Sequence, residues 1–507
     1  MRLGDLFHQA PPDAADADVS ALAYDDRQVA PGTAFFCVRG FTRDGHEFAP
    51  KAVAAGATAL VVDHPLDSGV PEIVVEDVRA AMAPAAAALA GDPTAELRTV
   101  GITGTNGKTT TSYLLRQLLE AGGIRTGLLG TVAQIVGGRE LDAGRTTPEA
   151  IDLQPRFRAM LDAGDGACVM EVSSHALELG RADAIHWAAA IFTNLTQDHL
   201  DFHPDLEAYF AAKARLFAAA GDVPKVVDVD DDHGRQLAGR HPDALTVAID
   251  ADDARYRAED VRSDLRGSTF TVAGRELRTT MPGRFNVRNA LQAYVTAVAL
   301  GVDEDVAAAA LASASGVPGR LESIVAGQPF AVLVDYAHTP DALDNVLQAA
   351  RRLVEDAAGD TVESETPAGE HAVGRVICLF GCGGDRDRTK RPQMGRIAAQ
   401  QADLAILTSD NPRSEDPEAI LDEVEAGMTE AYGRVERIAD RQAAIDRAIV
   451  EARAGDVVLI TGKGHEQGQT FADRTVPFDD RDAARRALQA AGWTQTEAAD
   501  QEDASRA

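Results

Sequence analysis

The stretch TVGITGTNGKTTTSYLLRQLLEA, residues 99–121, decides how the central part of this chain folds. Its β-branched start, Thr99–Thr103, predicts a strand, and residues 111–121 have the apolar spacing of a helix. Between them lies the glycine-rich loop Gly104-Thr105-Asn106-Gly107-Lys108-Thr109-Thr110. Backbone N–H groups at such a helix N-terminus bind phosphate, a lysine adds positive charge, and a hydroxyl can hold Mg²⁺. The strict phosphate-loop pattern is not met because Ile102 occupies its first glycine position, so a plain glycine-rich turn is the alternative.

The composition is that of a globular protein with several domains. Of 507 residues, 45% are hydrophobic and 25% are charged. At roughly 150 residues per domain, this length predicts about three domains. The formal net charge of -31 argues against binding to nucleic acid or to an anionic membrane surface. No apolar run is long enough for membrane insertion, the N-terminus has no apolar signal sequence, and the four cysteines are too scattered for a disulfide framework. We therefore expect a cytoplasmic protein.

Two breaks divide the pattern along the chain. Gly91-Asp92-Pro93 interrupts the first α/β region, and Val317–Glu322 precedes the last one. These breaks predict domains at 1–95, 96–321 and 322–507. Strands and helices alternate in all three, which is typical of α/β domains with mainly parallel sheets.

The expected elements are short apolar strands separated by helices. The strands are expected at 33–38, 57–62, 167–172, 188–193, 331–336, 375–380, 404–408 and 457–461, and helices at 78–90, 207–217 and 416–429. The acidic, Gly- and Thr-containing stretch 355–370 is predicted to be an exposed loop, and 494–507 a frayed tail.

Polar side chains follow two of the central strands. Glu171 comes at the end of one, where a carboxylate opposite the phosphate loop can hold Mg²⁺; the alternative there is a helix cap by Ser173 or Ser174. Thr193–Asp201, which contains His199, follows the next strand. Because the carboxyl ends of parallel strands share one edge, these clusters predict a metal and nucleotide site.

Lysine is scarce in this sequence. The six lysines are Lys51, Lys108, Lys213, Lys225, Lys390 and Lys463, and arginine supplies nearly all other positive charge. A remaining lysine is therefore more often found where an amine is needed. For Lys213 in the helix at 207–217, the residues alone still slightly favour a solvated surface position.

Three loops follow strands of the last domain, at 381–387, 408–413 and 461–466, and the first and the last of them contain glycine. They carry Arg386, Arg413 and Glu466, which together suit a zwitterion, since an Arg fork binds a carboxylate and a Glu binds an ammonium group. The alternative for Asp410-Asn411-Pro412 is an N-cap of the following helix.

Taken together, these segments resemble the Mur ligase family, within it the type that adds the third residue of the peptidoglycan stem peptide. The resemblance rests on motifs in family order, namely Gly104–Thr110, Thr146-Thr147-Pro148, Glu171–Leu177, Thr193–Asp201, Tyr209–Lys213, Gly283–Asn289, Val317–Glu322, Asp335–Pro340, Gly381–Asp387, Asp410–Arg413 and Gly462–Glu466. It implies a uridine-nucleotide-binding domain, a central P-loop ATPase domain and a Rossmann-like C-terminal domain. It also implies a monomeric amide ligase that uses ATP and Mg²⁺ to join meso-diaminopimelate to UDP-N-acetylmuramoyl-L-alanyl-D-glutamate through an acyl phosphate.

The resemblance also implies roles for individual residues. ATP is expected at Gly104, Thr105, Asn106, Gly107, Lys108, Thr109, Thr110, Asn286 and Arg320. Metal ligands are expected at Thr109, Glu171, His199 and a carbamate on Lys213, and catalytic roles at Lys108, Lys213 and His199. The UDP-linked substrate is expected at Tyr24, Asp26, Phe41, Thr42, Arg43, Thr146, Thr147, Ser173, Leu179 and Arg181. The diamino acid is expected at Arg386, Asp410, Asn411, Pro412, Arg413, Gly462 and Glu466.

The sequence departs from the family pattern at three positions of the substrate site. Asp26 stands where a Ser is expected, Arg145 where an Asn is expected, and Leu179 where a Gln is expected. The tetrapeptide Asp410–Arg413 accompanies meso-diaminopimelate in the family, and Arg413 is expected to grip its distal carboxylate. A buried Arg left unpaired by lysine would cost several kcal/mol, on the order of the penalty for breaking a buried ion pair. The tetrapeptide therefore argues against a lysine-adding relative and against folylpolyglutamate synthetase. A third alternative, a P-loop NTPase that uses hydrolysis as a switch, leaves the C-terminal pocket unexplained.

Overall fold

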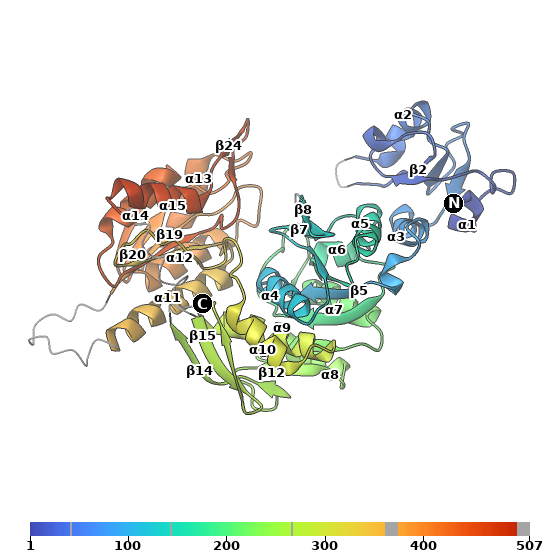
Figure 1. Cartoon of the computed structure of the whole chain (residues 1–507). Coiled ribbons are helices and arrows are strands. Elements are labelled where there is room, and N and C mark those ends of the chain that lie inside the picture. The colour runs from blue at the N-terminus through green and yellow to red at the C-terminus, as the bar shows by residue number, and fades with distance from the viewer. Residues whose placement is uncertain (41–42, 142–143, 265–266, 360–373, 494–507) are drawn as a thin grey trace, which may run out of the picture.

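Three α/β domains follow one another along the chain (Figure 1). The computed structural model describes residues 1–507 except 41–42, 142–143, 265–266, 360–373 and 494–507. In Figure 1 the N-terminal domain (blue) joins the central domain (cyan to green) on the side of α3, and the C-terminal domain (orange to red) lies on the opposite side. The predicted fold class is confirmed. The boundaries after residues 95 and 321 stay predictions; β5 begins at Arg98 and β17 at Glu322.

The N-terminal domain contains a four-stranded parallel sheet in the order β1-β2-β3-β4. Its elements are α1 (Leu3–Leu6), β1 (Ala21–Ala23), η1 (Asp26–Gln28), β2 (Thr33–Phe36), η2 (Gly45–Phe48), α2 (Ala49–Ala54), β3 (Ala59–Val62), β4 (Glu72–Val74) and α3 (Val78–Leu89). Asp77 begins α3 as its N-cap by accepting from the backbone N–H groups of Arg79 and Ala80. Helix α3 packs on α5 and so connects this domain to the next one.

The central domain is built on a nine-stranded sheet in the order β13-β12-β11-β10-β5-β9-β6-β7-β8. All neighbours from β13 to β6 are parallel, whereas β7 and β8 are antiparallel additions. The strands are β5 (Arg98–Thr103), β6 (Thr126–Leu129), β7 (Gln134–Val136), β8 (Arg139–Leu141), β9 (Ala167–Glu171), β10 (Trp187–Phe192), β11 (Lys225–Asp228), β12 (Leu245–Ala248) and β13 (Tyr256–Arg257). The helices are α4 (Lys108–Ala121), α5 (Ala150–Asp162), α6 (Ser174–Glu178), α7 (Leu206–Ala219), α8 (Asp232–Arg240), α9 (Arg284–Ala299) and α10 (Glu304–Ser313).

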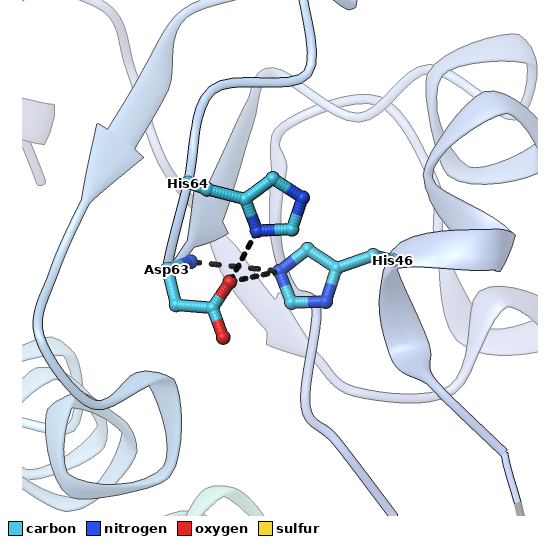
Figure 2. A group of neighbouring side chains, drawn as sticks. All are labelled: His46, Asp63 and His64. Carbon is cyan, nitrogen blue, oxygen red and sulfur yellow. Dashed lines mark hydrogen bonds and ion pairs between the residues drawn. The ribbon is translucent and has the colours of Figure 1, made fainter.

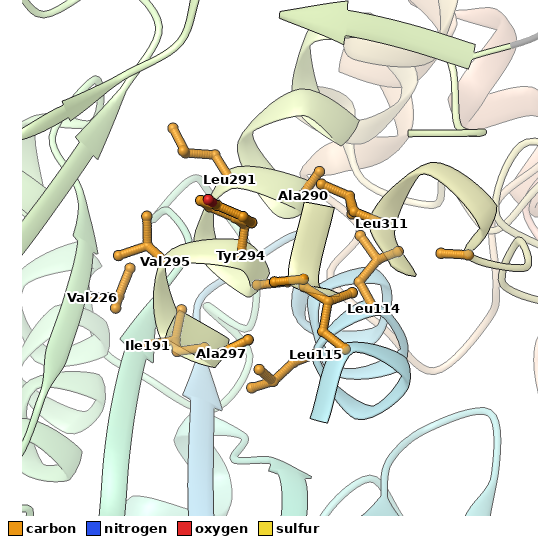
Figure 3. Close-up of a cluster of buried hydrophobic side chains, with 14 of the residues drawn as sticks. Leu114, Leu115, Ile191, Val226, Ala290, Leu291, Tyr294, Val295, Ala297 and Leu311 are labelled. Atoms are coloured by element: carbon orange, nitrogen blue, oxygen red, sulfur yellow. The ribbon is translucent and has the colours of Figure 1, made fainter. Parts of the chain in front are cut away.

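Helices cover both faces of this sheet because its strands are apolar on both sides. Successive residues of β9 point to opposite faces, so Val169 packs with α4 and α9 while Met170 packs with α5 and α7. Figure 3 shows the first of these layers, where Leu115 of α4 and Val295 of α9 meet Ile191 of β10. The buried layers fix the edge of the sheet from which the phosphate loop emerges.

A small antiparallel sheet of β14 (Glu259–Asp264), β15 (Gly267–Val272) and β16 (Arg275–Thr279) separates β13 from α9. The C-terminal domain has a six-stranded sheet in the order β17-β18-β22-β19-β20-β21, parallel except for β17. Its strands are β17 (Glu322–Ser323), β18 (Ala331–Asp335), β19 (Val376–Phe380), β20 (Leu404–Leu407), β21 (Arg434–Arg437) and β22 (Val457–Thr461), followed by the hairpin β23 (Gly468–Thr470) and β24 (Thr475–Pro477). Its helices are α11 (Pro340–Gly359), α12 (Lys390–Gln401), α13 (Pro417–Glu425), α14 (Arg441–Glu451) and α15 (Asp480–Ala490).

Several predicted boundaries differ from the structure. Helix α4 begins at Lys108 rather than at residue 111, because Thr109 and its two following threonines are buried and packing outweighs their weak helix propensity. The loop predicted at 355–370 is wrong at its start, since α11 continues to Gly359; the remainder lies outside the described residues. Helix α13 ends at Glu425, four residues before the predicted end. The predicted tail also lies outside the described residues.

Across the described part of the chain, none of the helices combines the length and apolarity needed to cross a membrane.

The buried layer on α4 predicts a specific stability effect. Leu115 is fully buried, so Leu115→Ala removes apolar contacts and leaves a cavity that costs about 2–5 kcal/mol. Leu206, which is 37% exposed at the start of α7, is a matched control whose change to Ala costs about 1 kcal/mol or less. Denaturant unfolding followed by Trp187 fluorescence, with Trp493→Phe in the background, measures both. Equal losses in the two variants would contradict the assigned core.

Candidate functional site

A cavity of about 370 Å³ lies at the carboxyl ends of β5, β9 and β10, between the central and C-terminal domains. Parallel strands place their carboxyl ends at this edge, where ligands of such sheets bind. Its lining includes twelve residues predicted from sequence, namely Thr105, Asn106, Gly107, Lys108, Thr109, Thr110, Thr146, Glu171, Ser173, His199, Asn286 and Arg320. The C-terminal domain adds Asp335, Tyr336, Ala337, His338, Asp341, Ala342, Asn345 and Val346.

The loop between β5 and α4 is packed too closely for side chains at its two glycines. A Cβ on Gly104 would lie 1.8 Å from the Thr193 hydroxyl, and one on Gly107 would lie 2.3 Å from Asn289 Oδ1. Both glycines also have positive φ angles, of 149° and 85°. Glycine is therefore required at both positions for the loop to pack against the segment after β10 and against α9.

Lys108 rests on the loop that it follows. Its Nζ donates to the carbonyl oxygens of Gly104 and Thr105, at 2.9 and 2.8 Å. Burial lowers the pKa of this amine, while Glu171 and Asp198 act in the opposite direction. The two carbonyl oxygens carry only partial negative charge. A bound phosphate would give the Lys108 amine a fully charged partner.

Glu171, the last residue of β9, is fully buried. Its carboxylate accepts from the hydroxyl of Thr109 at 3.0 Å, the backbone N–H of Thr131 at 2.9 Å and the Thr131 hydroxyl at 3.0 Å. The hydroxyl groups can turn their oxygen atoms toward a cation. Carboxylate and hydroxyl oxygens are ligands that Mg²⁺ accepts, so this corner fits the predicted ion. Ser173 does cap α6, by accepting from Ala176 N, so the capping interpretation also holds.

Lys213 of α7 is only 1% exposed, so the slight preference for a solvated surface position was wrong. Its Nζ donates to Gly104 O at 2.7 Å and lies 4.4 Å from the centre of the Tyr209 ring. Burial lowers its pKa well below the usual value, and the charge of Lys108 acts in the same direction. A buried amine with a lowered pKa is a better nucleophile than a surface lysine.

His199 lies in the cavity wall and has a positive φ of 55°. Its Nε2 is 3.4 Å from a carboxylate oxygen of Asp198, which also lines the cavity. Burial lowers the pKa of the His199 ring, so the ring is neutral at neutral pH and keeps a lone pair for a ligand.

Two contacts cross the cavity, one from the segment that joins the central and C-terminal domains and one from the C-terminal domain itself. Arg320 Nη2 donates to the Thr109 hydroxyl at 3.3 Å, and Asn106 Nδ2 donates to Asp341 Oδ2 at 2.7 Å. Asp335 holds the connecting segment by accepting from the backbone N–H groups of Leu321 and Ala337. The C-terminal domain therefore touches the phosphate loop directly.

The residues expected to hold the UDP-linked substrate are spread over two domains. Thr147 and Ser173 meet beside Glu171, where Ser173 N donates to the Thr147 hydroxyl. Tyr24 donates to Asp152 Oδ2 at 2.9 Å and so bridges the N-terminal and central domains. Asp26 begins the short helix η1, Leu179 ends α6, and Arg43 is exposed. Phe41 and Thr42 lie outside the described residues.

The buried carboxylate of Glu149 forms ion pairs with three arginines near these substrate-site residues. Arg181 Nε lies 2.9 Å, Arg145 Nη1 3.0 Å and Arg79 Nη1 3.1 Å from its carboxylate. Arg145, one of the three departures from the family pattern, therefore has an ion-pair partner within the structure. Arg181 also pairs with Glu149, so a substrate carboxylate would have to compete with Glu149 for the Arg181 guanidinium.

The three C-terminal loops are joined by direct contacts. Asn411 Nδ2 donates to Glu466 Oε2 at 2.6 Å, and Arg413 Nη1 donates to Gly384 O at 2.7 Å. Gly462 has a φ of 111° beside the Asp410 carboxylate. The capping alternative for residues 410–412 is wrong, because Asp416 is the N-cap of α13.

Two of the expected arginines are less enclosed than predicted. Arg413 is partly exposed rather than buried, so leaving it unpaired costs less than we expected. Arg386 is exposed and donates to its own loop, at Asp385 O.

Sequence reasoning missed several cavity residues. Thr131 and Asp228 follow the ends of β6 and β11, so the strand-end argument used for Glu171 could have found them. Outside the cavity, among the C-terminal loops, Lys463 was also missed; it is fully buried and donates to Asn411 Oδ1 at 2.7 Å, and its signal was the scarcity of lysine. No local pattern marked Asp341, whose place depends on how two domains meet.

Comparisons with known proteins agree with this arrangement along the whole chain. Residues 18–90 match the family described as "Mur ligase family, catalytic domain", residues 102–297 match "Mur ligase middle domain", and residues 319–464 match "Mur ligase, glutamate ligase domain". Curated relatives named UDP-N-acetylmuramoyl-L-alanyl-D-glutamate–2,6-diaminopimelate ligase cover nearly the full length. The protein from Solibacter usitatus is 45% identical over 98% of this chain and 100% of its own, and that from Geobacillus kaustophilus is 44% identical over 94% and 96%.

A solved structure carrying the same ligase name is 32% identical, with a TM-score of 0.68, over 97% of this chain and 100% of its own. The MurF ligase of Thermotoga maritima in complex with ADP has a TM-score of 0.62 at 17% identity, over 93% of this chain and 97% of its own. At that identity the likeness shows the fold alone.

His338 in the cavity wall predicts a pH dependence of stability. Burial lowers its pKa to about 4, and the charge of Lys390 acts in the same direction. The unfolded state, with a His pKa of about 6.5, binds a proton that the folded state does not, so stability falls as the pH drops from about 6.5 to 4, by up to about 3 kcal/mol. His338→Gln should flatten this part of the curve of melting temperature against pH. His186→Gln, at an exposed histidine, is the control; an unchanged slope in H338Q would contradict the assignment.

Proposed function

The chain belongs to the Mur ligase family, and we propose that it uses ATP to join meso-diaminopimelate to UDP-N-acetylmuramoyl-L-alanyl-D-glutamate. The observation that carries this proposal is the single cavity in which the phosphate loop of the central domain faces residues of the C-terminal domain. A ligase needs its activating phosphate and its attacking amine at one carbon atom. The residues expected to bind the diamino acid do not line this cavity, but Tyr336 in its wall lies 5.1 Å, ring centre to ring centre, from His465 in the loop that carries Glu466. A monomer and a cytoplasmic location remain predictions from the sequence.

The chemistry follows from the weakness of a carboxylate as an electrophile. A carboxylate oxygen of the dipeptide attacks the γ-phosphorus of ATP, and the bond to the departing ADP breaks. The amine of the diamino acid then attacks the acyl carbon and gives a tetrahedral intermediate. Loss of phosphate and of the amine proton leaves the amide.

We assign the phosphate-binding role to Lys108 and the loop backbone, with Arg320 reaching the same corner from the segment just before β17. Glu171 and Thr109 supply oxygen ligands suited to Mg²⁺, and His199 faces the same cavity. When bound, the ion neutralises phosphate charge. Asn286, buried at the start of α9, stays the candidate for the adenine side.

We also infer that Lys213 carries a carbamate. Its neutral amine can attack CO₂, forming an N–C bond and releasing one proton, and the product is an anionic oxygen group. Burial and the nearby positive charge of Lys108 both favour the neutral amine that reacts, and the charge of Lys108 also favours the anionic product.

For the diamino acid, the partly exposed guanidinium of Arg413 suits a carboxylate, and Glu466 suits an ammonium group. Lysine lacks the distal carboxylate and leaves Arg413 without a charged partner. We therefore expect a preference for diaminopimelate over lysine that is smaller than a fully buried Arg413 would give, since water reaches this side chain.

Phosphate release from ATP, measured with the UDP-linked dipeptide and either meso-diaminopimelate or L-lysine, tests the function and this preference together. We expect release with diaminopimelate, a product heavier by that residue, and at least about 10-fold lower kcat/KM with lysine. Arg413→Ala should raise the KM for diaminopimelate by about 10- to 100-fold with little change in the KM for ATP.

Arg434→Ala is the matched control, because this exposed arginine begins β21, at the edge of the sheet opposite the three loops, and pairs with Glu436 and Glu451. Release without either amino acid would favour a simple nucleotidase. Equal use of both amino acids would retain the ligase and reject the role of Arg413.

Removing the Lys213 amine should abolish most activity and allow chemical rescue. Lys213→Ala leaves a space beside Gly104 O, and we expect a loss of at least about 100-fold, as for removal of a metal-site ligand. Added formate or acetate should restore part of the phosphate release if a carbamate is the missing group. Lys213→Met fills the same space and should resist rescue, whereas equal rescue of both variants would reject the carbamate.

A further inference from the structure

Two histidines and a carboxylate converge at the carboxyl end of β3 in the N-terminal domain (Figure 2). His46 lies in η2, and Asp63 and His64 directly follow β3. His46 Nε2 is 3.2 Å and His64 Nδ1 is 2.5 Å from the same oxygen atom, Asp63 Oδ1. Among the residues that the structure describes, this is the group of three or more His, Cys, Asp or Glu side chains whose ligand atoms all lie within 4.8 Å of one another.

A second carboxylate orients one of these rings. Asp44 Oδ1 lies 2.6 Å from His46 Nδ1 and also accepts from the His46 backbone N–H at 3.0 Å. The proton on Nδ1 is therefore engaged with Asp44, so the lone pair is on Nε2, which accepts a long hydrogen bond from the Asp63 backbone N–H at 3.5 Å and faces the Asp63 carboxylate. A metal-binding histidine typically has this arrangement, in which a carboxylate holds the nitrogen that does not bind the ion. His46 is 9% exposed, so the orientation is fixed by packing as well.

The spacing fits a small tetrahedral ion after one modest movement. Ligand atoms about 2.05 Å from a tetrahedral Zn²⁺ are about 3.3 Å apart. The distance from His46 Nε2 to Asp63 Oδ1, 3.2 Å, already matches. His64 must move outward by several tenths of an ångström, and its side chain is 50% exposed and free to do so.

Charge around the group also suits a cation. Two carboxylates lie beside the two imidazoles, Asp63 at the centre of the group and Asp44 behind His46. Arg39 is the opposing positive charge: its Nε lies 2.9 Å from Asp63 Oδ2, and its Nη2 donates to Asp63 Oδ1 at 3.3 Å. The Arg39 side chain is 62% exposed, so an ion bound at Oδ1 would displace the longer Nη2 contact and leave the Nε contact in place.

We propose that His46, Asp63 and His64 bind a divalent transition-metal ion of the Zn²⁺ class, with Asp44 as the residue that positions His46. Two imidazoles and one carboxylate leave a fourth position for water, as in three-ligand zinc sites. The central cavity is lined by residues from Thr105 to Val346, so this site is separate from it. Bound there, the ion connects η2 to the end of β3 and stabilises the N-terminal domain.

Titration of the untagged, metal-free chain with ZnCl₂ by calorimetry, without nucleotide, tests the proposal independently of ligase activity. We expect one ion per chain at this site and a melting temperature that rises with zinc concentration. His64→Ala and Asp63→Asn should each weaken binding by at least about 100-fold. Asp44→Asn keeps the cap of η2, since Asn also caps helices, and should weaken binding by about 10- to 100-fold.

His186→Ala is the matched control. His186 Nε2 lies 3.0 Å from Asp92, so it is a second His–Asp pair but without a third ligand, and zinc binding should not change. Zinc affinity unchanged in both His64→Ala and Asp63→Asn would overturn the proposal. So would absence of binding in the unmodified chain, or loss of the ion through His199→Ala instead, which would place it in the central cavity.

Discussion

The close packing of the phosphate loop against the segment after β10 is the constraint on which the site depends. Thr105 N donates to Asn194 O at 2.9 Å, Asn106 N donates to Asn194 Oδ1 at 2.9 Å, and the Thr193 hydroxyl donates to Asn106 O at 2.5 Å. These bonds hold the loop where glycine alone fits at position 104. The start of α4, and with it the direction of its first N–H groups, follows from this contact.

Two buried amines meet the same backbone carbonyl group. Lys108 and Lys213 both donate to Gly104 O, one from the helix after the loop and one from α7. Their mutual repulsion and burial disfavour the charged form of each amine. The structure tolerates this arrangement because carbonyl oxygens partly satisfy both amines, and because anionic groups are expected to occupy the space between them.

The fold was largely predictable because its signals are local. Apolar strands followed by polar residues located β5, β9 and β10, and the same pattern led to Glu171 and the C-terminal loops. Tertiary contacts decided what remained. Burial of Lys213 depends on how α7 packs on the sheet, the exposure of Arg413 depends on its loop, and Asp341 reaches Asn106 only where two domains meet. The roles of the substrate-site residues rest on the family resemblance, since geometry alone does not distinguish one carboxylate ligand from another.

The contacts of Lys108 have a consequence for small inhibitors. Its amine already has two carbonyl partners at 2.9 and 2.8 Å, so a simple anion gains only the difference between its own attraction and the bonds that it replaces. A compound that mimics phosphate alone will therefore bind weakly. Affinity must come from groups that also reach the C-terminal wall of the cavity, at His338 or Asn345, so that the compound binds two domains at once.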